Sequence, residues 1–583
     1  MRITFLIILL QLSLQTFAQT KELSSFYEKS GCKETPRYDS TIAYCKMLDQ
    51  ASKQIKYLSF GKSPQGREMP LLILDKKGNF TAEAIHKSGN VILLIQAAVH
   101  AGEPDGKDAG LLLFRDIAIY KKMTELLDNV SVLFIPIFNV DGHERFGKYN
   151  RINQNGPTEM GWRTTANNLN LNRDFLKADA TEMKNWLKLF NHYMPDFFID
   201  CHTTDGADYQ YVITYGIETD GNVDEGLIKW QKEKYLTSIT KQMTQQGFPI
   251  FPYVTFRNWH DPRSGLISNA APPMLSQGYT IQRNRPGLLI ETHMLKSYKI
   301  RVESTYKMIE NTIIILNREH QQLKKLISEA DKKTASEDFR KSEFSVNFED
   351  SQNDSSMIDF LGVEYSIEKS DISGGDWFKY DNSKPLTFKV PYFNKIETTQ
   401  KVLLPKAYII APEWNEVIDI LKLHGIIMKE LKTAMTLKVA SYKFRNPKWQ
   451  STSYEGRLPL ISFDMENIEE ERIYPAGSVI IDMNQAGARI IAYLLEPKAS
   501  GSLVFWGFFN TIFEQKEYAE SYVIETMARE MLANDAKLKN EFEKKKKSEP
   551  EFANNTRAIL NWFYSKTLYW DQRLNSYPIG KIF

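Results

Sequence analysis

The chain has 583 residues, of which 42% are hydrophobic and 25% are charged, which is the composition of a folded globular protein. Its 74 Lys and Arg residues nearly balance its 72 Asp and Glu residues, so the net charge is only +2. This balance excludes a protein dominated by a basic nucleic-acid surface, and also a disordered acidic protein. Three cysteines are too few for a disulfide-rich scaffold or for a zinc site of four thiolates.

The N-terminus has the pattern of a signal peptide. Arg2 precedes a mainly apolar run, and the run ends at the small residue Ala18, a suitable cleavage position. The run is shorter than the roughly 20 residues that a membrane span needs. We expect residues 1–18 to be removed and the mature chain, with no membrane span, to be exported to the periplasm or the medium. Export would permit a disulfide between Cys32 and Cys45, which the sequence leaves open.

Apolar strand patterns alternate with amphipathic helix patterns from residue 91 onward. The predicted strands cover residues 91–99, 130–138, 196–200 and 287–291, and the predicted helices cover residues 104–120, 181–193 and 299–325. Strands separated by helices are typical of α/β proteins. We therefore predict a mixed, largely parallel central sheet flanked by helices.

A second domain is predicted after this α/β unit. The stretch 332–343 is polar and charged and has no apolar period, so we interpret it as a linker. We expect one domain over residues 19–335 and a second over residues 336–583. The second domain mixes strand and helix patterns, which predicts an α+β fold, and nothing in it has the spacing of metal ligands.

The clearest chemical signal is a pair of histidines that follow buried strands. His100 and Glu103 come directly after the predicted strand 91–99, and His202 follows the strand 196–200. Ligands in open α/β sheets bind at the carboxyl ends of the strands, so these three side chains are candidates for one shared cation. Two histidines and one carboxylate, with one position left open, form the ligand set of a catalytic zinc site.

Other candidate residues surround this set in the sequence. Glu291 ends another buried strand and is a candidate general base. Arg163 is a candidate to stabilise a developing oxyanion. Asn172 and Arg173 are candidates to bind a carboxylate of the substrate, because the Arg guanidinium pairs with a carboxylate in a bidentate fork. The alternative for Glu291 is a structural ion pair. Taken singly, Arg163, Asn172 and Arg173 are better explained by a surface ion pair or a loop hydrogen bond.

The order of these motifs resembles that of the M14 zinc carboxypeptidases. The chain contains, in sequence order, His100-x-x-Glu103, NVDG at 139–142, WR at 162–163, NLNR at 170–173, His202 and Glu291. The resemblance covers roughly residues 50–320. The segment QGYTIQRNRPGLLIETH and parts of the C-terminal region also resemble exported bacterial relatives of that family.

The resemblance implies a zinc carboxypeptidase fold and a set of roles. One zinc ion per chain would be bound by His100, Glu103 and His202. Glu291 would activate water, and Arg163 would stabilise the oxyanion. The terminal carboxylate of a peptide substrate would be bound by Asn172 and Arg173. The expected activity is hydrolysis of C-terminal peptide bonds without a covalent intermediate.

Two positions depart from the family pattern or leave it uncertain. The family often has Asp where this chain has Asn170, and that Asp orients a zinc-binding histidine; Asn can still accept a hydrogen bond but polarises the imidazole less. The family also has a tyrosine that closes over the substrate. Tyr279 is the nearest candidate in sequence order, twelve residues before Glu291, although its spacing is not clearly right. His260 lies in a loop that could line the pocket.

Three hypotheses follow for the function. The first is an exported zinc metallocarboxypeptidase that acts on peptides with a free C-terminal carboxylate. The second is a related zinc amidase that acts on cell-wall peptides. The third is a non-catalytic relic that binds peptides or glycans, which the retention of all three ligands and Glu291 disfavours. Neither the side-chain specificity nor the oligomeric state is indicated by the sequence.

Overall fold

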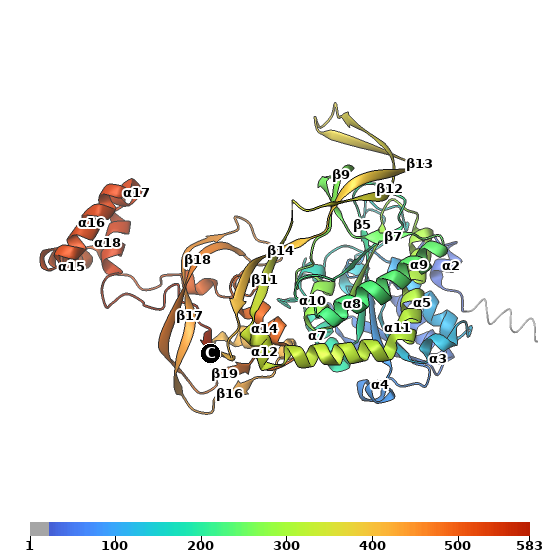
Figure 1. The fold of residues 1–583 in the computed structure, drawn as a ribbon, viewed down its shortest axis with the longest axis horizontal. Helices are drawn as coiled ribbons and strands as arrows, with labels where there is room; N and C mark the ends of the chain where they lie inside the picture. The colour runs from blue at the N-terminus through green and yellow to red at the C-terminus, as the bar shows by residue number, and fades with distance from the viewer. Residues whose placement is uncertain (1–22, 352) are drawn as a thin grey trace, which may run out of the picture.

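The computed structural model of the protein describes residues 23–351 and 353–583 (Figure 1). The predicted signal peptide, residues 1–18, lies outside the described residues. Cys32, Cys45 and Cys201 are all free, so the disulfide between Cys32 and Cys45 is not formed. Among the described residues, no helix combines the length and the apolar character needed to cross a bilayer.

An eight-stranded sheet forms the centre of the N-terminal part, in the order β1-β2-β4-β3-β5-β10-β6-β7. Strands β3, β4, β5 and β10 run parallel to one another, while β1, β2 and β6 join antiparallel neighbours. The predicted mixed, largely parallel sheet is confirmed. The strands are β1 (Ile55–Lys62), β2 (Glu68–Leu74), β3 (Val91–Ala97), β4 (Val130–Ile135), β5 (Phe197–Thr204), β6 (Ile213–Ile217), β7 (Ile250–Pro252) and β10 (Gly287–His293).

Alternate residues of the central strands face two separate hydrophobic clusters, because side chains on a strand point to opposite faces. On β3, Leu93 and Ile95 pack with helices of one face, and Ile92 and Leu94 pack with the other. The first face is covered by α3 (Tyr38–Ala51), α5 (Asp105–Ala118), α8 (Glu225–Trp230), α9 (Thr237–Gln245) and α11 (Tyr298–Thr334), and the second by α4 (Ala82–Ser88) and α7 (Thr181–Tyr193). Burial on both faces explains why these strands consist mainly of apolar residues.

Short helical segments complete the N-terminal part. They are α2 (Phe26–Lys29), η1 (Thr124–Leu127), α6 (Val140–Glu144), η2 (Leu171–Arg173), the π-helical η3 (Gln231–Leu236) and α10 (Ser276–Gln282). The predicted helix 181–193 is reproduced by α7, and the predicted helix 299–325 is longer in the structure because α11 runs from Tyr298 to Thr334.

The stretch 332–343, predicted to be a linker without helical period, is largely helical. Its first residues continue α11, and Glu337–Lys341 form α12. Ser336 caps α12 by accepting a hydrogen bond from the Phe339 backbone N–H, and Lys341 lies 3.4 Å from Glu337 one turn away. These local interactions support a helix that has no apolar face.

Strands from the C-terminal part pair with strands of the N-terminal part. The long hairpin of β12 (Ser356–Lys369) and β13 (Asp376–Phe393) joins β9 (Asp261–Ile267) and β8 (Thr255–Asn258) in a four-stranded sheet, and it projects from the top of the molecule in Figure 1. Beside it, β11 (Glu343–Asp350) pairs with β14 (Ile396–Leu403). A sheet is therefore shared across the predicted domain boundary near residue 336. Whether the two sides of this boundary fold independently stays a prediction.

A six-stranded antiparallel sheet forms the body of the C-terminal part, in the order β16-β19-β15-β20-β17-β18. Many of its buried side chains, such as Tyr408 and Ile481, belong to the same hydrophobic cluster as Trp186 of α7, so one continuous core joins the two parts. Others, such as Ile409 and Tyr474, form a separate small cluster. The elements are β15 (Ala407–Ile410), η4 (Pro412–Trp414), α13 (Asn415–Leu423), β16 (Lys429–Glu430), β17 (Met435–Trp449), β18 (Leu460–Tyr474), β19 (Val479–Asp482), α14 (Ala488–Leu495), η5 (Asn510–Phe513) and β20 (Gly580–Ile582).

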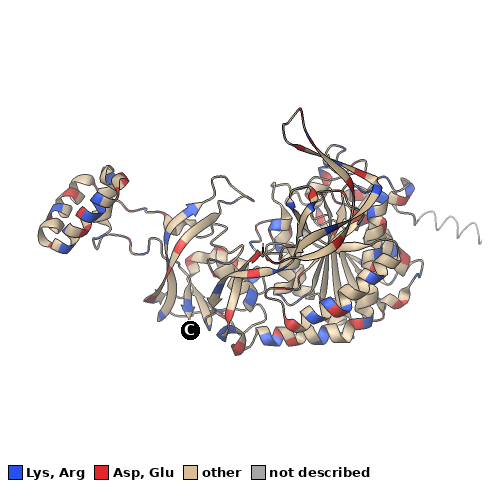
Figure 2. Ribbon diagram, turned by 45° about the horizontal axis from the view of Figure 1, so that its top comes forward, with Lys and Arg blue, Asp and Glu red and all other residues tan. Residues whose placement is uncertain are grey.

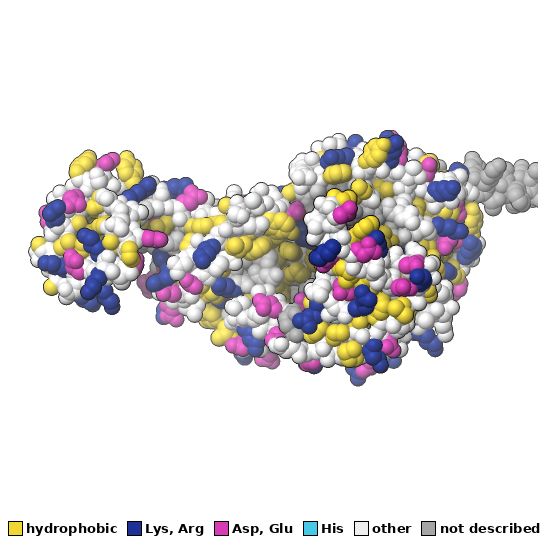
Figure 3. Space-filling model, turned by 90° about the horizontal axis from the view of Figure 1, so that it is seen from above, with side chains coloured by type: hydrophobic (Ala, Val, Ile, Leu, Met, Phe, Trp, Pro, Cys, Tyr) yellow, Lys and Arg dark blue, Asp and Glu magenta, His cyan; other side chains and the backbone are white. Residues whose placement is uncertain are grey.

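Four further helices form a small bundle that stands apart at the left of Figure 1. They are α15 (Ser521–Asn534), α16 (Ala536–Ser548), α17 (Pro550–Ala553) and α18 (Thr556–Tyr564), and they have a hydrophobic cluster of their own. Basic and acidic residues alternate over all parts of the molecule, as the balanced composition implies (Figure 2). Figure 3 shows hydrophobic side chains gathered where the N-terminal and C-terminal parts meet.

Candidate active site

Three neighbouring strands carry the predicted site residues. His100 and Glu103 lie in the turn between β3 and α5, His202 lies on β5, and Glu291 lies on β10 directly beside His202 in the parallel register. The turn packs closely on a second loop, because a Cβ atom at Gly102 would lie 2.7 Å from the carbonyl oxygen of Gly161. A larger side chain there would displace the His100–Glu103 turn.

His100, Glu103 and His202 meet at one point. Their ligand atoms all lie within 4.8 Å of one another, and all three residues are buried. His100 Nδ1 lies 3.1 Å from Glu103 Oε1, His202 Nδ1 lies 3.2 Å from Glu103 Oε2, and the two Nδ1 atoms are 3.3 Å apart. Imidazole nitrogen and carboxylate oxygen are the donors that zinc prefers, so these residues fit a zinc ion.

The second ring nitrogen of each histidine has a hydrogen-bonding or charged partner. His100 Nε2 lies 3.0 Å from Asn170 Oδ1. Asn170 therefore occupies the position from which the Asp of the family pattern would orient a zinc-binding histidine. His202 Nε2 lies 2.9 Å from Asp200 Oδ2 in an ion-pair contact. Partners of this kind fix the orientation of histidine ligands. Asp200 was missed in the sequence, although it lies two residues before His202 and therefore on the same face of the strand.

Glu103 is held by groups beyond the two histidines. The Arg151 guanidinium donates a hydrogen bond of 2.7 Å to Oε1, and the Thr203 backbone N–H donates one of 2.9 Å to Oε2. Burial by itself would raise the pKa of Glu103, but its contacts with His100, the Arg151 guanidinium and His202 hold it well below its usual range. Glu103 is therefore a carboxylate, the form that binds a cation. No sequence pattern pointed to Arg151.

The two histidines differ in their electrostatic surroundings. Burial lowers the pKa of His100 to about 4, so its ring is neutral. Burial also disfavours the charged form of His202, but the Asp200 carboxylate outweighs it and raises the pKa of His202 well above its usual range. Because a metal ligand must be neutral imidazole, binding of a divalent ion here would release the His202 proton.

Of the remaining predicted residues, Arg163, Asn172, Arg173 and Glu291 line one cavity of about 380 Å³ together with His100 and Glu103, whereas Tyr279 and His260 do not. Glu291 faces this cavity, and burial raises its pKa to about 8. Among the described residues, no group donates a hydrogen bond to its carboxylate. Arg163 is half exposed and lies 3.8 Å from Glu103, while Asn172 and Arg173 enter from η2. The structure thus places the Glu291 carboxyl group, the Arg163 guanidinium and the Asn172–Arg173 pair around the candidate metal site.

Tyr279 does not lie in this cavity, and the prediction that it closes over a substrate is wrong. Its side chain is fully buried on α10, where it packs against Trp186 and Phe190. Its hydroxyl lies 2.9 Å from His424 Nδ1 in the C-terminal part. The tyrosine that lines the cavity is Tyr253, with 37% of its surface exposed, in the connection between β7 and β8.

Comparison with known proteins agrees with this geometry. Residues 41–246 match the family model described as zinc carboxypeptidase. The chain contains a zinc carboxypeptidase domain of the M14 family. It is a peptide hydrolase, and the recognition of the family from its motifs is confirmed.

Two fungal proteins and two solved bacterial structures illustrate the similarity. Carboxypeptidase 2 of Trichophyton rubrum is 22% identical over 498 residues, which are 81% of this chain and 84% of that protein. Carboxypeptidase 2 of Trichophyton equinum is 23% identical over 499 residues, with coverages of 81% and 84%. The metallo-carboxypeptidases of Burkholderia cenocepacia and Pseudomonas aeruginosa are each 17% identical, with TM-scores of 0.36 and 0.37; they cover 48% and 49% of this chain, and 70% of each of those chains is matched.

The similarity to the fungal proteins reaches beyond the zinc carboxypeptidase domain into the C-terminal part, since it covers 81% of this chain. In the structure that part touches the site. Glu455 Oε2 accepts a hydrogen bond of 2.8 Å from the backbone N–H of Asn170, the residue beside His100. Arg457 pairs with Asp179 at 2.6 Å in the same loop region. No local pattern marked Glu455, which lies 285 residues from Asn170 in the chain.

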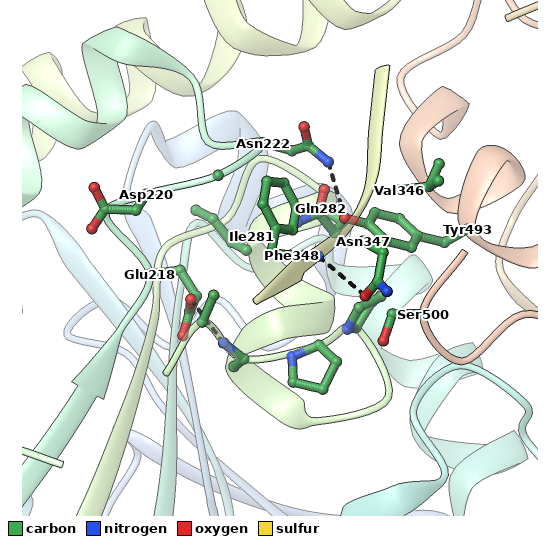
Figure 4. A pocket seen from close by; sticks show the side chains of 15 residues that line it. Glu218, Asp220, Asn222, Ile281, Gln282, Val346, Asn347, Phe348, Tyr493 and Ser500 are labelled. Atoms are coloured by element: carbon green, nitrogen blue, oxygen red, sulfur yellow. Dashed lines mark hydrogen bonds between the residues drawn. The ribbon is translucent and has the colours of Figure 1, made fainter. Parts of the chain in front are cut away.

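A second, small cavity of about 50 Å³ lies between the zinc carboxypeptidase domain, β11 and the segment around α14 (Figure 4). Glu218 lines it, and its carboxylate accepts a hydrogen bond of 3.1 Å from the Ala271 backbone N–H. Ala270, Ala271 and Pro272 line both this cavity and the active-site cavity. Glu218 therefore contacts the loop that forms one wall of the active site.

Burial raises the pKa of Glu218 from 4.5 to about 8, which predicts a pH-dependent stability. The folded state binds this proton more tightly than the unfolded state, so the stabilisation is complete below pH 4.5 and is lost as the pH rises through 8. At pH 8.5 we expect Glu218→Gln to have a free energy of unfolding higher than that of the wild type by on the order of 2 kcal/mol, after allowing for the partial exposure of Glu218. The variant should therefore unfold at a higher urea concentration at pH 8.5. At pH 4.5 the two proteins should unfold at the same urea concentration. Equal shifts at both pH values would contradict this assignment.

Proposed function

We propose that the protein is an exported zinc metallocarboxypeptidase that removes the C-terminal residue from peptides with a free α-carboxylate. His100, Glu103 and His202 would hold one zinc ion. The N-terminal pattern of residues 1–18 supports export to the periplasm or the medium.

One observation carries this proposal. The ligand atoms of His100, Glu103 and His202 lie within 4.8 Å of one another, and the cavity lined by His100 and Glu103 is also lined by Glu291 and Arg173. A metal ligand set, a carboxyl group without hydrogen-bond donors and an anion-binding guanidinium are the three parts that metal-assisted hydrolysis of a terminal peptide bond needs.

Glu291 is the proposed general base and acid. When bound, zinc supplies Lewis acidity and lowers the pKa of water towards about 7 in sites of this kind. Burial raises the pKa of Glu291 to about 8, but the positive charge of a bound zinc ion would lower it, so that Glu291 would be a carboxylate at neutral pH. This carboxylate faces the cavity next to His202, is otherwise unpaired among the described residues, and accepts the proton of the attacking water. It then gives this proton to the nitrogen of the leaving amine.

The cationic residues orient the substrate. Arg163 reaches the cavity beside Glu103, where its guanidinium would stabilise negative charge that develops on the scissile carbonyl oxygen. Asn172 and Arg173 would bind the terminal carboxylate. The Arg173 guanidinium donates to the carbonyl oxygen of Asn172 at 2.8 Å, so both side chains are directed by one short 3₁₀ turn.

Replacement of Arg173 by Ala tests the role of the terminal carboxylate. We expect KM for free-acid peptides to rise roughly 10- to 100-fold with a smaller change in kcat, because a charged hydrogen-bonded pair is lost. Steady-state kinetics with matched free-acid and amidated peptides would measure this. Arg529→Ala, at an exposed position of α15, is the matched control. If Arg173→Ala kept the full preference for free acids over amides, Arg173 would not bind the carboxylate.

The activity itself is tested with blocked dipeptides and with purified cell-wall muropeptides, before and after chelation of metal. Hydrolysis of dipeptides that have a free carboxyl end, lost on chelation and restored by zinc, supports the proposal. Release from muropeptides alone would favour an amidase of cell-wall peptides. Zinc binding without hydrolysis of either substrate would favour a non-catalytic relic.

A further inference from the structure

A second large cavity, of about 830 Å³, adjoins the active site. Its walls come from two distant parts of the chain: the turn between β8 and β9 with the ends of β5 and β10, and the tip of the β12–β13 hairpin. Asp205 and Met294 line both this cavity and the active-site cavity. The two cavities are therefore adjacent and share a wall near the ends of the strands that carry His202 and Glu291.

The hairpin is fastened to the zinc carboxypeptidase domain by specific contacts. The Tyr380 hydroxyl donates a hydrogen bond of 2.5 Å to the carbonyl oxygen of His260. The Arg263 guanidinium lies 3.9 Å from the centre of the Tyr365 ring and donates a hydrogen bond of 2.7 Å to its hydroxyl. Backbone pairing of β13 with β9 adds to these contacts. These contacts hold the hairpin in place as one wall of the cavity.

Aromatic side chains line this wall and stay exposed. Trp259 is 56% exposed and Trp377 is 53% exposed, and Phe378 lies beside them. Because Trp259, Trp377 and Phe378 line the same cavity, they form a contiguous aromatic surface, which is typical of a ligand-binding groove. The Trp377 ring already has the Lys379 ammonium 3.9 Å from its centre, so a cation packs on this wall within the chain itself.

The charge of the cavity is negative. Asp205, Asp371 and Asp376 line it, and no Lys or Arg does. Lys369 pairs with Asp376 at 2.6 Å, but among the described residues no cation lies within ion-pair distance of Asp205 or Asp371. Aromatic rings together with unpaired carboxylates form the surroundings that a Lys or Arg side chain prefers.

We propose that this cavity, which we call the upstream groove, binds the part of a peptide substrate that precedes the scissile bond and prefers a lysine or arginine there. The inference rests on the proposed function, because Arg173 would hold the terminal carboxylate and the rest of the peptide would have to leave the active site. The upstream groove lies next to the active-site cavity, with Asp205 and Met294 lining both, so a peptide chain that leaves the active site there would enter the groove.

Peptides that differ only upstream test the inference. Blocked peptides with the same two C-terminal residues, and with Lys, Gln or Glu at each of the three positions before them, are compared with the blocked dipeptide alone. We expect kcat/KM to be about tenfold higher for Lys than for Gln at one of these positions, and lower again for Glu. Added salt should reduce the advantage of Lys, because it screens the carboxylates.

Two variants test the groove itself. Trp259→Ala and Asp371→Asn are expected to remove most of the tenfold advantage of Lys while changing hydrolysis of the dipeptide less than twofold. Tyr522→Ala on α15, which is 72% exposed, and Asp338→Asn on α12, which is 94% exposed, are the matched controls and should keep the advantage. Both altered groove positions are exposed, so we expect the two variants to keep the fold. Circular dichroism would check this.

The outcomes separate the two proposals. If the wild type hydrolyses the dipeptide but treats Lys, Gln and Glu peptides alike, the upstream groove has no preference for cations and the inference is overturned. If it hydrolyses no peptide with a free carboxylate, the proposed function fails instead. If the Trp259→Ala change impairs only substrates that carry a glycan, the groove binds sugar and the inference is likewise overturned.

Discussion

Replacement of Glu291 by Gln is expected to lower kcat by about 10²- to 10⁴-fold while the bound zinc stays at one ion per chain. Gln has almost the same shape as Glu but cannot take up a proton. Because Glu291 belongs to none of the three ligand positions, zinc should remain bound. Kinetics on a blocked dipeptide and metal analysis of the same preparation would measure both quantities.

The structure makes this substitution a clean test. Among the described residues, the Glu291 carboxyl group accepts no hydrogen bond, so the amide breaks none. Glu310 is the matched control: it is also buried, but it lies on α11 and pairs with Lys307 at 2.7 Å. Glu310→Gln should keep kcat within about twofold. Full activity in Glu291→Gln would remove Glu291 as the general base.

Replacement of His202 by Asn is the second prediction, with an expected increase of at least roughly 100-fold in the zinc dissociation constant. Loss of a group that merely orients a ligand already costs about 10- to 100-fold, and His202 would be a ligand itself. The change also leaves Asp200 without the imidazole that lies 2.9 Å from it, so an unpaired buried carboxylate is added. Competition with a chromophoric chelator would measure the affinity.

The matched control for His202→Asn is His86→Asn, an exposed position near the end of α4. This control should bind zinc as the wild type does. Hydrolysis by His202→Asn should be lost at limiting zinc and recovered only in part at high zinc. Unchanged zinc affinity in this variant would show that the ion, if present, is not held by His202, and it would contradict the assigned site.

Much of the fold was predictable because the central strands are buried on both faces. Strands such as β3 and β4 are fully buried and apolar at all but one position each, and α7 matches its predicted limits. The candidate metal site was predictable for a related reason: His100, Glu103, His202 and Glu291 all follow or end such strands. Parallel strands bring their carboxyl ends to one edge, so residues 191 positions apart in the chain become neighbours.

Other features depended on contacts between distant segments. Tyr279 was assigned by its order in the chain, but α10 packs it into the core beside His424 of the C-terminal part. Tyr253, Arg151 and Glu455 were missed because no local pattern marks them. Each of them reaches the site only through the packing of its loop.

The sequence alone was enough to recognise the class of this protein and to name a candidate ligand set and a candidate general base, because strand burial and short motifs are local properties of the chain. The tertiary structure alone decided how the C-terminal part contributes. That part shares a core with α7, contacts the Asn170 loop through Glu455, and supplies the hairpin that walls the upstream groove. Side chains from segments far apart in the chain create these surfaces, and their register follows from packing rather than from any local pattern.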